Sequence, residues 1–370
     1  MNQVEKRKNQ TFSVLCSCTP RRSHLVTPHG RVCAVSEEQY PLCFFCLCHR
    51  NMFLPILGLV VFGFVYRWYK ERKRVHNKAD KYVYITGCDT GFGNLLAKHL
   101  DQLGFCVIAG CYTEKGEDEL KKTSSDRLTT IHLDVTDSES VSKAAAFIKT
   151  LVGEKYLWAV VNNAGVGVPS GPDDWLTIED HKSMIGVNLL GVIDVTLSVL
   201  SLIKKARGRV VNVASVFGRI TTFGGPYCLS KYGVEAFSDS LRLTMGHFGV
   251  KVSCIEPGFF KTGLTDVAIL QNSLTKLWGR LPPDVKDDYG RNFIDNSLAL
   301  CEKRINQLAD GNLMKVVNSM EHAVSAVYPR ARYTVGWDAK LIWLPLSYMP
   351  SCICDRMLRI NSPKPAASVL

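Results

Sequence analysis

Three side chains near the middle of the sequence have the types and spacing needed to move a proton to or from an alcohol oxygen. Tyr227 and Lys231 are four residues apart, so a helix would place them on one face. A phenol has a pKa near about 10 and is a poor base at neutral pH, but a neighbouring ammonium favours the phenolate. Ser215 ends an apolar run upstream of Tyr227, where its hydroxyl can hydrogen-bond a substrate oxygen. A Tyr–Lys pair alone is common on helix surfaces, so a second signal is needed.

A glycine-rich turn provides that second signal. The sequence T-G-C-D-T-G-F-G at 86–93 follows an apolar segment and opens a helical pattern. Glycines at a strand-to-helix turn let the backbone approach a pyrophosphate, which then lies at the positive end of the helix. N-N-A-G at 162–165 follows a second apolar segment. The combination predicts a dinucleotide beside the tyrosine, lysine and serine.

These motifs occur in the order typical of short-chain dehydrogenases/reductases, and the sequence resembles that family. The segments T-G-C-D-T-G-F-G-N-L-L-A, W-A-V-V-N-N-A-G-V and Y-C-L-S-K-Y-G-V-E-A-F-S-D-S-L-R resemble, more narrowly, its membrane-bound retinol dehydrogenase / 17-beta-hydroxysteroid dehydrogenase 6-like branch. The resemblance runs from about Met52 to Leu370. It implies a Rossmann fold, a nicotinamide dinucleotide, and a lipophilic alcohol as substrate, either retinol or a 3α- or 17β-hydroxysteroid.

The resemblance also implies a role for each motif residue. Tyr227 would transfer the proton, Lys231 would lower the tyrosine pKa and hold the nicotinamide ribose, and Ser215 would orient the substrate. Asn188 would support the proton relay. The dinucleotide would be held by Thr86, Gly87, Asp89, Gly91, Phe92, Gly93, Asp134, Val135, Asn162, Ala164, Gly165, Tyr227, Lys231, Pro257, Gly258 and Thr262.

The choice between NAD and NADP depends on the residues that end the second predicted strand. An acidic residue there would bind the ribose 2′-hydroxyl and reject a 2′-phosphate. The sequence has Cys111 at that point, Glu114 comes slightly late for the role, and Lys115 could attract a phosphate. The resemblance favours NAD, with NADP as the alternative.

A parallel sheet would position all of these side chains. Apolar runs rich in Val and Ile predict strands at 82–86, 106–111, 129–134, 158–163, 209–215, 251–257 and 332–336. Helical patterns lie between them at about 94–103, 138–152, 176–205 and 227–247. Buried strands that alternate with helices indicate an α/β fold, a doubly wound parallel sheet covered on both faces. We predict one catalytic domain over residues 81–340.

Apolar segments flank this domain on both sides. Residues 52–66 carry no charge, and Trp68 and Tyr69 can extend them into the headgroup region, so 52–69 is predicted to be an uncleaved membrane anchor. Residues 1–40 have no periodicity, and residues 1–51 form an uncertain N-terminal extension, with Met52 as an alternative start. The apolar tail at 341–370 contains Pro345 and Pro350, which favour an interfacial or tunnel-lining segment over a straight spanning helix.

The net charge of +11 is concentrated outside the predicted domain. Residues 1–51 hold seven basic and three acidic residues, and 67–81 hold seven and two. A nucleic-acid partner needs its basic face on the folded part, so none is expected. If translation starts at Met52, the basic residues that follow the apolar run predict an endoplasmic reticulum membrane protein whose catalytic domain faces the cytosol, in contact with membrane lipid; the seven basic residues of 1–51, if translated, weaken this asymmetry. No metal is expected, because no second ligand pair accompanies the cysteines at 43–48.

Two other functions are compatible with these motifs. One is a catalytically silent membrane-bound retinoid or lipid carrier, against which the intact Ser215, Tyr227 and Lys231 argue. The other is an NADP-dependent reductase of retinal or ketosteroids. The segment at 264–330 is expected to shape the substrate pocket but does not rank retinoids against steroids, and a homodimer is one assembly that the resemblance allows.

Overall fold

The computed structural model describes residues 42–222, 225–360 and 362–369, with side chains from residue 55 onward. The predicted extension at 1–51 therefore lies outside the described residues, apart from a stretch of helical backbone at its end. The chain forms two units, residues 1–63 and residues 64–370. The second contains the sheet and the candidate site.

Seven parallel strands form one sheet in the order β3-β2-β1-β4-β5-β6-β7. The strands are β1 (Tyr82–Thr86), β2 (Cys106–Cys111), β3 (Leu128–His132), β4 (Leu157–Asn162), β5 (Arg209–Val213), β6 (Lys251–Pro257) and β7 (Arg332–Val335). Ile85 in β1 lies between Ala109 of β2 and Val161 of β4, and all three are fully buried. The doubly wound parallel sheet predicted from the sequence is confirmed.

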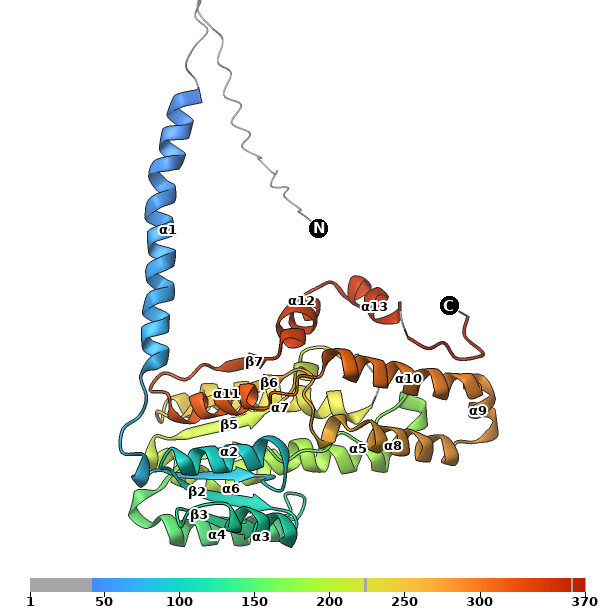
Figure 1. Cartoon of the computed structure of the whole chain (residues 1–370), viewed down its shortest axis with the longest axis horizontal. Helices are drawn as coiled ribbons and strands as arrows, with labels where there is room; N and C mark the ends of the chain where they lie inside the picture. The colour runs from blue at the N-terminus through green and yellow to red at the C-terminus, as the bar shows by residue number, and fades with distance from the viewer. Residues whose placement is uncertain (1–41, 223–224, 361, 370) are drawn as a thin grey trace, which may run out of the picture. The chain divides into compact units, whose positions relative to one another are not determined.

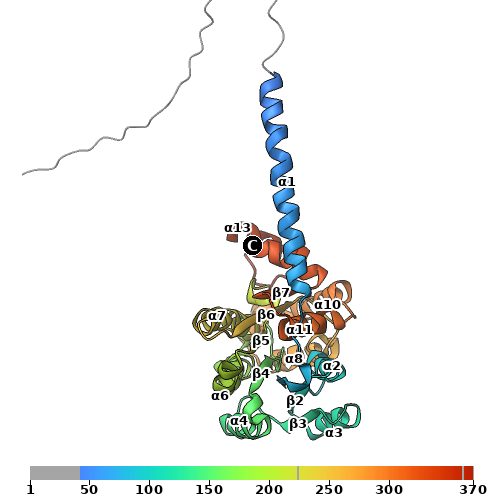
Figure 2. The same ribbon diagram turned by 90° about the vertical axis from the view of Figure 1, so that its left-hand side faces the viewer.

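Helices cover both faces of this sheet (Figure 2). On one face, α2 (Gly91–Gln102), α3 (Glu114–Lys122) and α11 (Met314–Ser325) contribute Leu96, Leu120 and Val316 to the larger core cluster. On the other face, α4 (Ser138–Val152), α6 (Gly191–Ala206) and α7 (Pro226–Gly246) contribute Ile148, Val199 and Leu241 to a second cluster. Of these helices, α2, α4, α6 and α7 fall within helical patterns predicted from the sequence, whereas α3 and α11 were not predicted.

Additional helices lie at the carboxyl edge of the sheet, and others follow the last strand along the chain (Figure 1). The stretch predicted as one helix at 176–205 is α5 (Ile178–Ile185), a π-turn (Gly186–Leu190) and α6. The segment at 264–330 forms α8 (Val267–Arg280), α9 (Pro283–Tyr289) and α10 (Arg291–Leu308) before α11. After β7 come a second π-turn (Ala339–Trp343), α12 (Leu344–Ser347) and α13 (Ser351–Arg359).

Two helical stretches are long and apolar. Helix α1 (Leu42–Arg72) begins ten residues before the predicted anchor, and its large apolar side chains are exposed, with Leu59 at 71% and Phe64 at 70%. Among the described residues, Ile178–Ala206 has the length and mean hydropathy, 1.9, to cross a membrane. This second stretch is a core helix, because Val195, Val199 and Ile203 are buried against the sheet.

Candidate active site

A cavity of about 920 Å³ lies at the carboxyl ends of the strands. It opens beside β1 and β4, where the strand order reverses and where doubly wound sheets bind ligands. The residues predicted from the sequence that line it are Gly87, Asp89, Gly91, Phe92, Asp134, Val135, Ala164, Gly165, Ser215, Tyr227, Lys231, Pro257, Gly258 and Thr262. Four others, Thr86, Gly93, Asn162 and Asn188, are not among its lining residues.

Helix α7 presents Tyr227 and Lys231 toward Ser215. The helix begins at Pro226, a residue type favoured in the first helical turn, so Tyr227 lies in that turn and Lys231 one turn later. The side chains of Tyr227 and Ser215 are hydrogen-bonded, and Lys231 Nζ lies 5.7 Å from the centre of the Tyr227 ring. Ser215 follows β5, where its Oγ accepts a hydrogen bond from the Phe217 amide at 3.2 Å. The three side chains therefore meet at one side of the cavity.

Burial sets the proton affinities of this group. It raises the pKa of Tyr227 to about 12, against the opposing effect of the hydrogen bond with Ser215. It lowers the pKa of Lys231 to about 8, while Nζ donates a hydrogen bond to the Val213 carbonyl oxygen at 3.0 Å. The phenol is therefore protonated at neutral pH unless a further positive charge lies near it.

The glycine turn brings helix α2 against the loop after β4. A Cβ atom at Gly93 would lie 2.3 Å from the Gly87 carbonyl oxygen and 2.5 Å from Asn163 Nδ2. A Cβ atom at Gly87 would lie 2.7 Å from Ala164 Cα. Gly87 and Gly91 have φ angles of 69° and 63°, which favour glycine. The first turn of α2, with its unpaired amides and positive dipole end, therefore lies beside the cavity, where a pyrophosphate would bind.

The two asparagines of N-N-A-G have different roles in the structure. Asn163 lines the cavity and donates from Nδ2 to the carbonyl oxygens of Thr86 at 3.0 Å and Gly87 at 2.9 Å. Asn162 is buried in β4, where its Nδ2 donates to Thr196 Oγ1 and Asn212 Oδ1, both at 2.8 Å. Of the two, Asn162 was predicted from the sequence to bind the dinucleotide, and Asn163 was not. Strand alternation was the available signal, because consecutive residues point to opposite sides of a strand.

Asn188 lies in the π-turn between α5 and α6 and is fully buried. Its Oδ1 accepts a hydrogen bond from the Val166 amide at 2.8 Å, and its Nδ2 donates to the Val166 carbonyl oxygen at 2.9 Å. Nδ2 also donates to Ser230 Oγ at 3.2 Å. The side chain thus ties the loop after β4 to helix α7, next to Lys231.

Comparison with known proteins agrees with this geometry. The model of the short chain dehydrogenase family matches residues 81–272. The chain belongs to this family. It is 50% identical over 318 residues to retinol dehydrogenase 7 of Rattus norvegicus and 47% identical over 318 residues to 17-beta-hydroxysteroid dehydrogenase type 6 of Homo sapiens; each match covers 86% of this chain and 100% of the relative. Its fold is similar to that of a short-chain dehydrogenase from Streptomyces avermitilis, with a TM-score of 0.59 and 24% identity. The match covers 72% of this chain and 91% of the other.

A member of the short-chain dehydrogenase family is an oxidoreductase that uses a nicotinamide dinucleotide, and the cavity fits such a group. Gly87, Gly91 and Gly93 form a glycine cradle beside the cavity, and the open space at the Cβ position of Gly91, which lines the cavity, leaves room for a pyrophosphate. Lys231 reaches the cavity with a buried amine, and the loop of Pro257, Gly258 and Thr262 lines the same end. These residues would hold the nicotinamide half.

An acidic side chain of this dehydrogenase lies at the end of β2, although β2 itself supplies none. Asp89, from the glycine turn, accepts hydrogen bonds from the backbone amides of Tyr112 at 2.9 Å and Thr113 at 2.8 Å. Tyr112 and Asp89 both line the cavity. Lys115 does not line it and pairs with Glu119 at 3.8 Å instead. An acid at this position was expected from β2 itself, whereas the structure supplies it from the glycine turn.

Proposed function

We propose that this short-chain dehydrogenase oxidises the hydroxyl of a lipophilic alcohol, retinol or a 3α- or 17β-hydroxysteroid, with NAD. The observation that carries the proposal is the meeting of Tyr227, Ser215 and Lys231 beside a glycine cradle in one cavity. The names of the two mammalian relatives indicate the substrate classes. Val166, Phe260 and Leu264 line the same cavity and suit an apolar substrate.

The proposed mechanism assigns one task to each side chain. Ser215 donates a hydrogen bond to the substrate oxygen and orients the alcohol. Tyr227 accepts the hydroxyl proton as a phenolate, as a general base must. The ammonium of Lys231 stabilises that phenolate across the short distance to the ring. A bound nicotinamide dinucleotide supplies the hydride acceptor.

The position of Asp89 supports NAD over NADP. Its carboxylate lies at the end of β2, beside Tyr112 and Thr113, where the 2′ position of an adenosine ribose binds in doubly wound folds. A carboxylate accepts a hydrogen bond from a 2′-hydroxyl and repels a 2′-phosphate. Lys115 lies away from the cavity lining and is 84% exposed, so it offers little attraction to that phosphate.

Membrane lipid is the second proposed partner. Helix α13 exposes an apolar stripe at the spacing of one helix face, and Arg356 and Arg359 lie near it. Nine residues of helix are too short to cross a bilayer, which needs about 20, so α13 would lie in the interface. The exposed apolar length of α1 would supply the anchor. Ile353 and Met357, one turn apart in α13, are exposed by 46 and 55%, and Met349 and Ile360, just outside its two ends, are exposed by 50 and 69%.

A substrate panel tests the proposed function. Full-length protein in microsomes should form NADH when retinol or a 3α-hydroxysteroid is added with NAD. The absorbance of NADH measures the rate. A soluble short-chain alcohol should give little signal, because it gains little from an apolar cavity. NADPH-dependent reduction of retinal in the absence of alcohol oxidation would favour the reductase instead. Binding of retinoid without turnover of any substrate would favour a carrier.

A further inference from the structure

The segment that follows β7 returns to the active site. Trp343 in the second π-turn and Leu346 in α12 are buried in a cluster with Phe217, and Tyr227 packs against it. The rings of Phe217 and Trp343 lie 5.5 Å apart, centre to centre. Phe217 is two residues beyond Ser215. The start of the predicted apolar tail is therefore in contact with the residues around the proposed catalytic pair.

Asp338 connects this segment to the dinucleotide end of the cavity. It is fully buried, and its Oδ2 accepts a hydrogen bond from the Phe259 amide at 2.9 Å and from the Trp343 indole at 3.2 Å. Phe259 directly follows Pro257 and Gly258, which line the cavity. One carboxylate oxygen thus joins the loop after β6 to the aromatic ring that packs beside Phe217.

The other carboxylate oxygen of Asp338, Oδ1, lies so close to the backbone of two glycines that a side chain at either position would collide with it. A Cβ atom at Gly258 would lie 2.2 Å from Oδ1, and one at Gly336 would lie 2.6 Å from it. Gly336 has a φ angle of 111°, which a side chain would strain. The loop backbone therefore rests directly on the carboxylate, and a change at Asp338 must move the loop.

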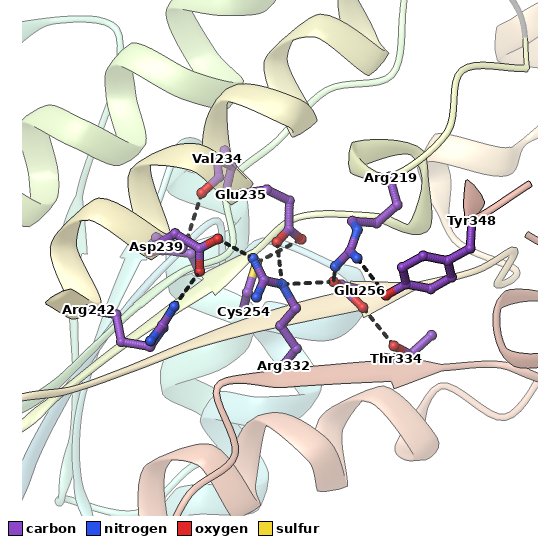
Figure 3. A network of polar contacts seen from close by, with 12 residues as sticks. Arg219, Val234, Glu235, Asp239, Arg242, Cys254, Glu256, Arg332, Thr334 and Tyr348 are labelled. Atoms are coloured by element: carbon purple, nitrogen blue, oxygen red, sulfur yellow. Dashed lines mark hydrogen bonds and ion pairs between the residues drawn. The ribbon is translucent and has the colours of Figure 1, made fainter. Parts of the chain in front are cut away.

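A second connection reaches the turn that begins at Ser215. Figure 3 shows Arg219 between Glu256 and Tyr348, with Nη1 donating to Glu256 Oε1 at 3.1 Å and Nη2 donating to the Tyr348 hydroxyl at 2.9 Å. Arg219 ends the turn Val216–Gly218 that follows Ser215. Glu256 is 1% exposed and directly precedes Pro257.

Arg332 of β7 holds the acidic side of this network to the catalytic helix. Its Nε lies 3.0 Å from Glu235 Oε2 and 3.4 Å from Glu256 Oε1, and its Nη2 lies 2.6 Å from Asp239 Oδ2 (Figure 3). Glu235 is on α7, one turn after Lys231. Two buried carboxylates would repel each other without a cation between them. Arg332 supplies that cation and so holds β6, β7 and α7 together.

We infer that the segment 336–348 positions groups for the proposed reaction. In it, Asp338 fixes the position of the loop after β6, which would hold the dinucleotide, and Tyr348 fixes the turn that follows Ser215. Neither side chain lines the cavity, so both act through the residues that do. The inference rests on the proposed function, and it divides the effects of the two residues between the two ligands. A change at Asp338 should weaken the binding of the dinucleotide, and a change at Tyr348 should raise the KM for the alcohol.

Two conservative variants of the full-length protein test this division. Asp338→Asn removes the charge and one good acceptor, and should raise the Kd for NAD, measured by titration calorimetry, about tenfold while the alcohol KM changes less than twofold. Tyr348→Phe removes only the exposed hydroxyl that Arg219 contacts, and should raise the alcohol KM about threefold with the Kd for NAD unchanged. Asp126→Asn, an exposed acid in the loop before β3, is the matched control and should change neither.

The split between the two constants decides the outcome. If both variants alter both constants alike, or if Asp338→Asn lowers the melting temperature without changing the Kd for NAD, the segment is merely structural and the inference is overturned. Tyr348→Phe keeps the test decisive should Asp338→Asn fold poorly, because Tyr348 is 71% exposed and its unchanged alcohol KM would also overturn the inference. Absence of alcohol oxidation by the parent protein, with NAD still bound, would instead contradict the proposed function.

Discussion

The reactivity of Tyr227 is set by influences that act in opposite directions. Burial raises the pKa of its phenol to about 12, and the hydrogen bond with Ser215 lowers it. The ammonium of Lys231 favours the phenolate while it remains protonated, and burial reduces its own pKa to about 8. Alcohol oxidation consumes the phenolate, whereas carbonyl reduction consumes the phenol, so the two directions must respond oppositely to pH.

We expect alcohol oxidation to become faster, and carbonyl reduction slower, as pH rises over the range in which Lys231 keeps its ammonium, that is, up to its pKa of about 8. Ser215→Ala removes the hydrogen bond that lowers the Tyr227 pKa. The ascending limb of kcat/KM should then move to higher pH by about one unit, the equivalent of about 1.4 kcal/mol. Profiles of kcat/KM against pH in both directions provide the measurement. An ascending limb that stays in place in Ser215→Ala would contradict the assigned hydrogen bond.

The charge of Asp89 governs the choice of dinucleotide in this account. Asp89→Asn removes the negative charge and replaces one of the two oxygens that accept from the amides of Tyr112 and Thr113 by an NH2 group, so one of these two hydrogen bonds is retained. The ratio of kcat/KM for NAD to that for NADP should fall about tenfold, because a repulsion worth about 1.4 kcal/mol is lost. Lys115→Ala is the control and should leave NAD kinetics nearly intact. A parent that favours NADP, with an NADP-specific loss in Lys115→Ala, would reverse the assignment.

At the scale of elements, the sheet could be predicted from the sequence and much of its surroundings could not. The runs of Val and Ile mark every strand to within two residues, because both faces of a parallel sheet are buried. Helix α3 was missed, since only Gly116 and Leu120 of its nine residues are buried and its apolar pattern is weak. The roles of Asp89, Asp338 and Tyr348 depend on contacts across 23 to 129 residues, which no local pattern encodes.

The close packing of helix α2 on the loop after β4 yields a prediction at this scale. Gly93→Ala places a Cβ atom against the Gly87 carbonyl and Asn163, so we expect a loss of about 1–3 kcal/mol in the free energy of unfolding and a higher Kd for NAD. Gly279→Ala in α8 has open space and is the matched control, with stability unchanged or slightly higher. Denaturant unfolding and NAD titration measure both. Equal behaviour of the two variants would show that the cradle is not tight.

At the scale of the whole molecule, the charges beside α1 predict on which side of the membrane the site lies. Arg67, Lys70, Arg72, Lys73 and Arg74 follow the apolar run, and the more basic flank stays in the cytosol. Among the described residues, the eight cysteines are all free thiols, as expected in a reducing compartment. Protease added to sealed microsomes should therefore digest the catalytic domain without detergent. Protection until detergent is added would place the domain in the lumen, leaving the enzymatic assignment intact.

The central claim, that Tyr227 carries the proton in alcohol oxidation, is tested most directly by Tyr227→Phe in the full-length protein. The change removes one oxygen and retains the ring, so the cavity and the glycine cradle should keep their shape. NADH formation from the alcohol should fall by a factor of at least about 100, the low end of what general acid–base catalysis contributes, while the Kd for NAD stays within about twofold. Alcohol oxidation near the parent rate, with NAD bound normally, would contradict the account.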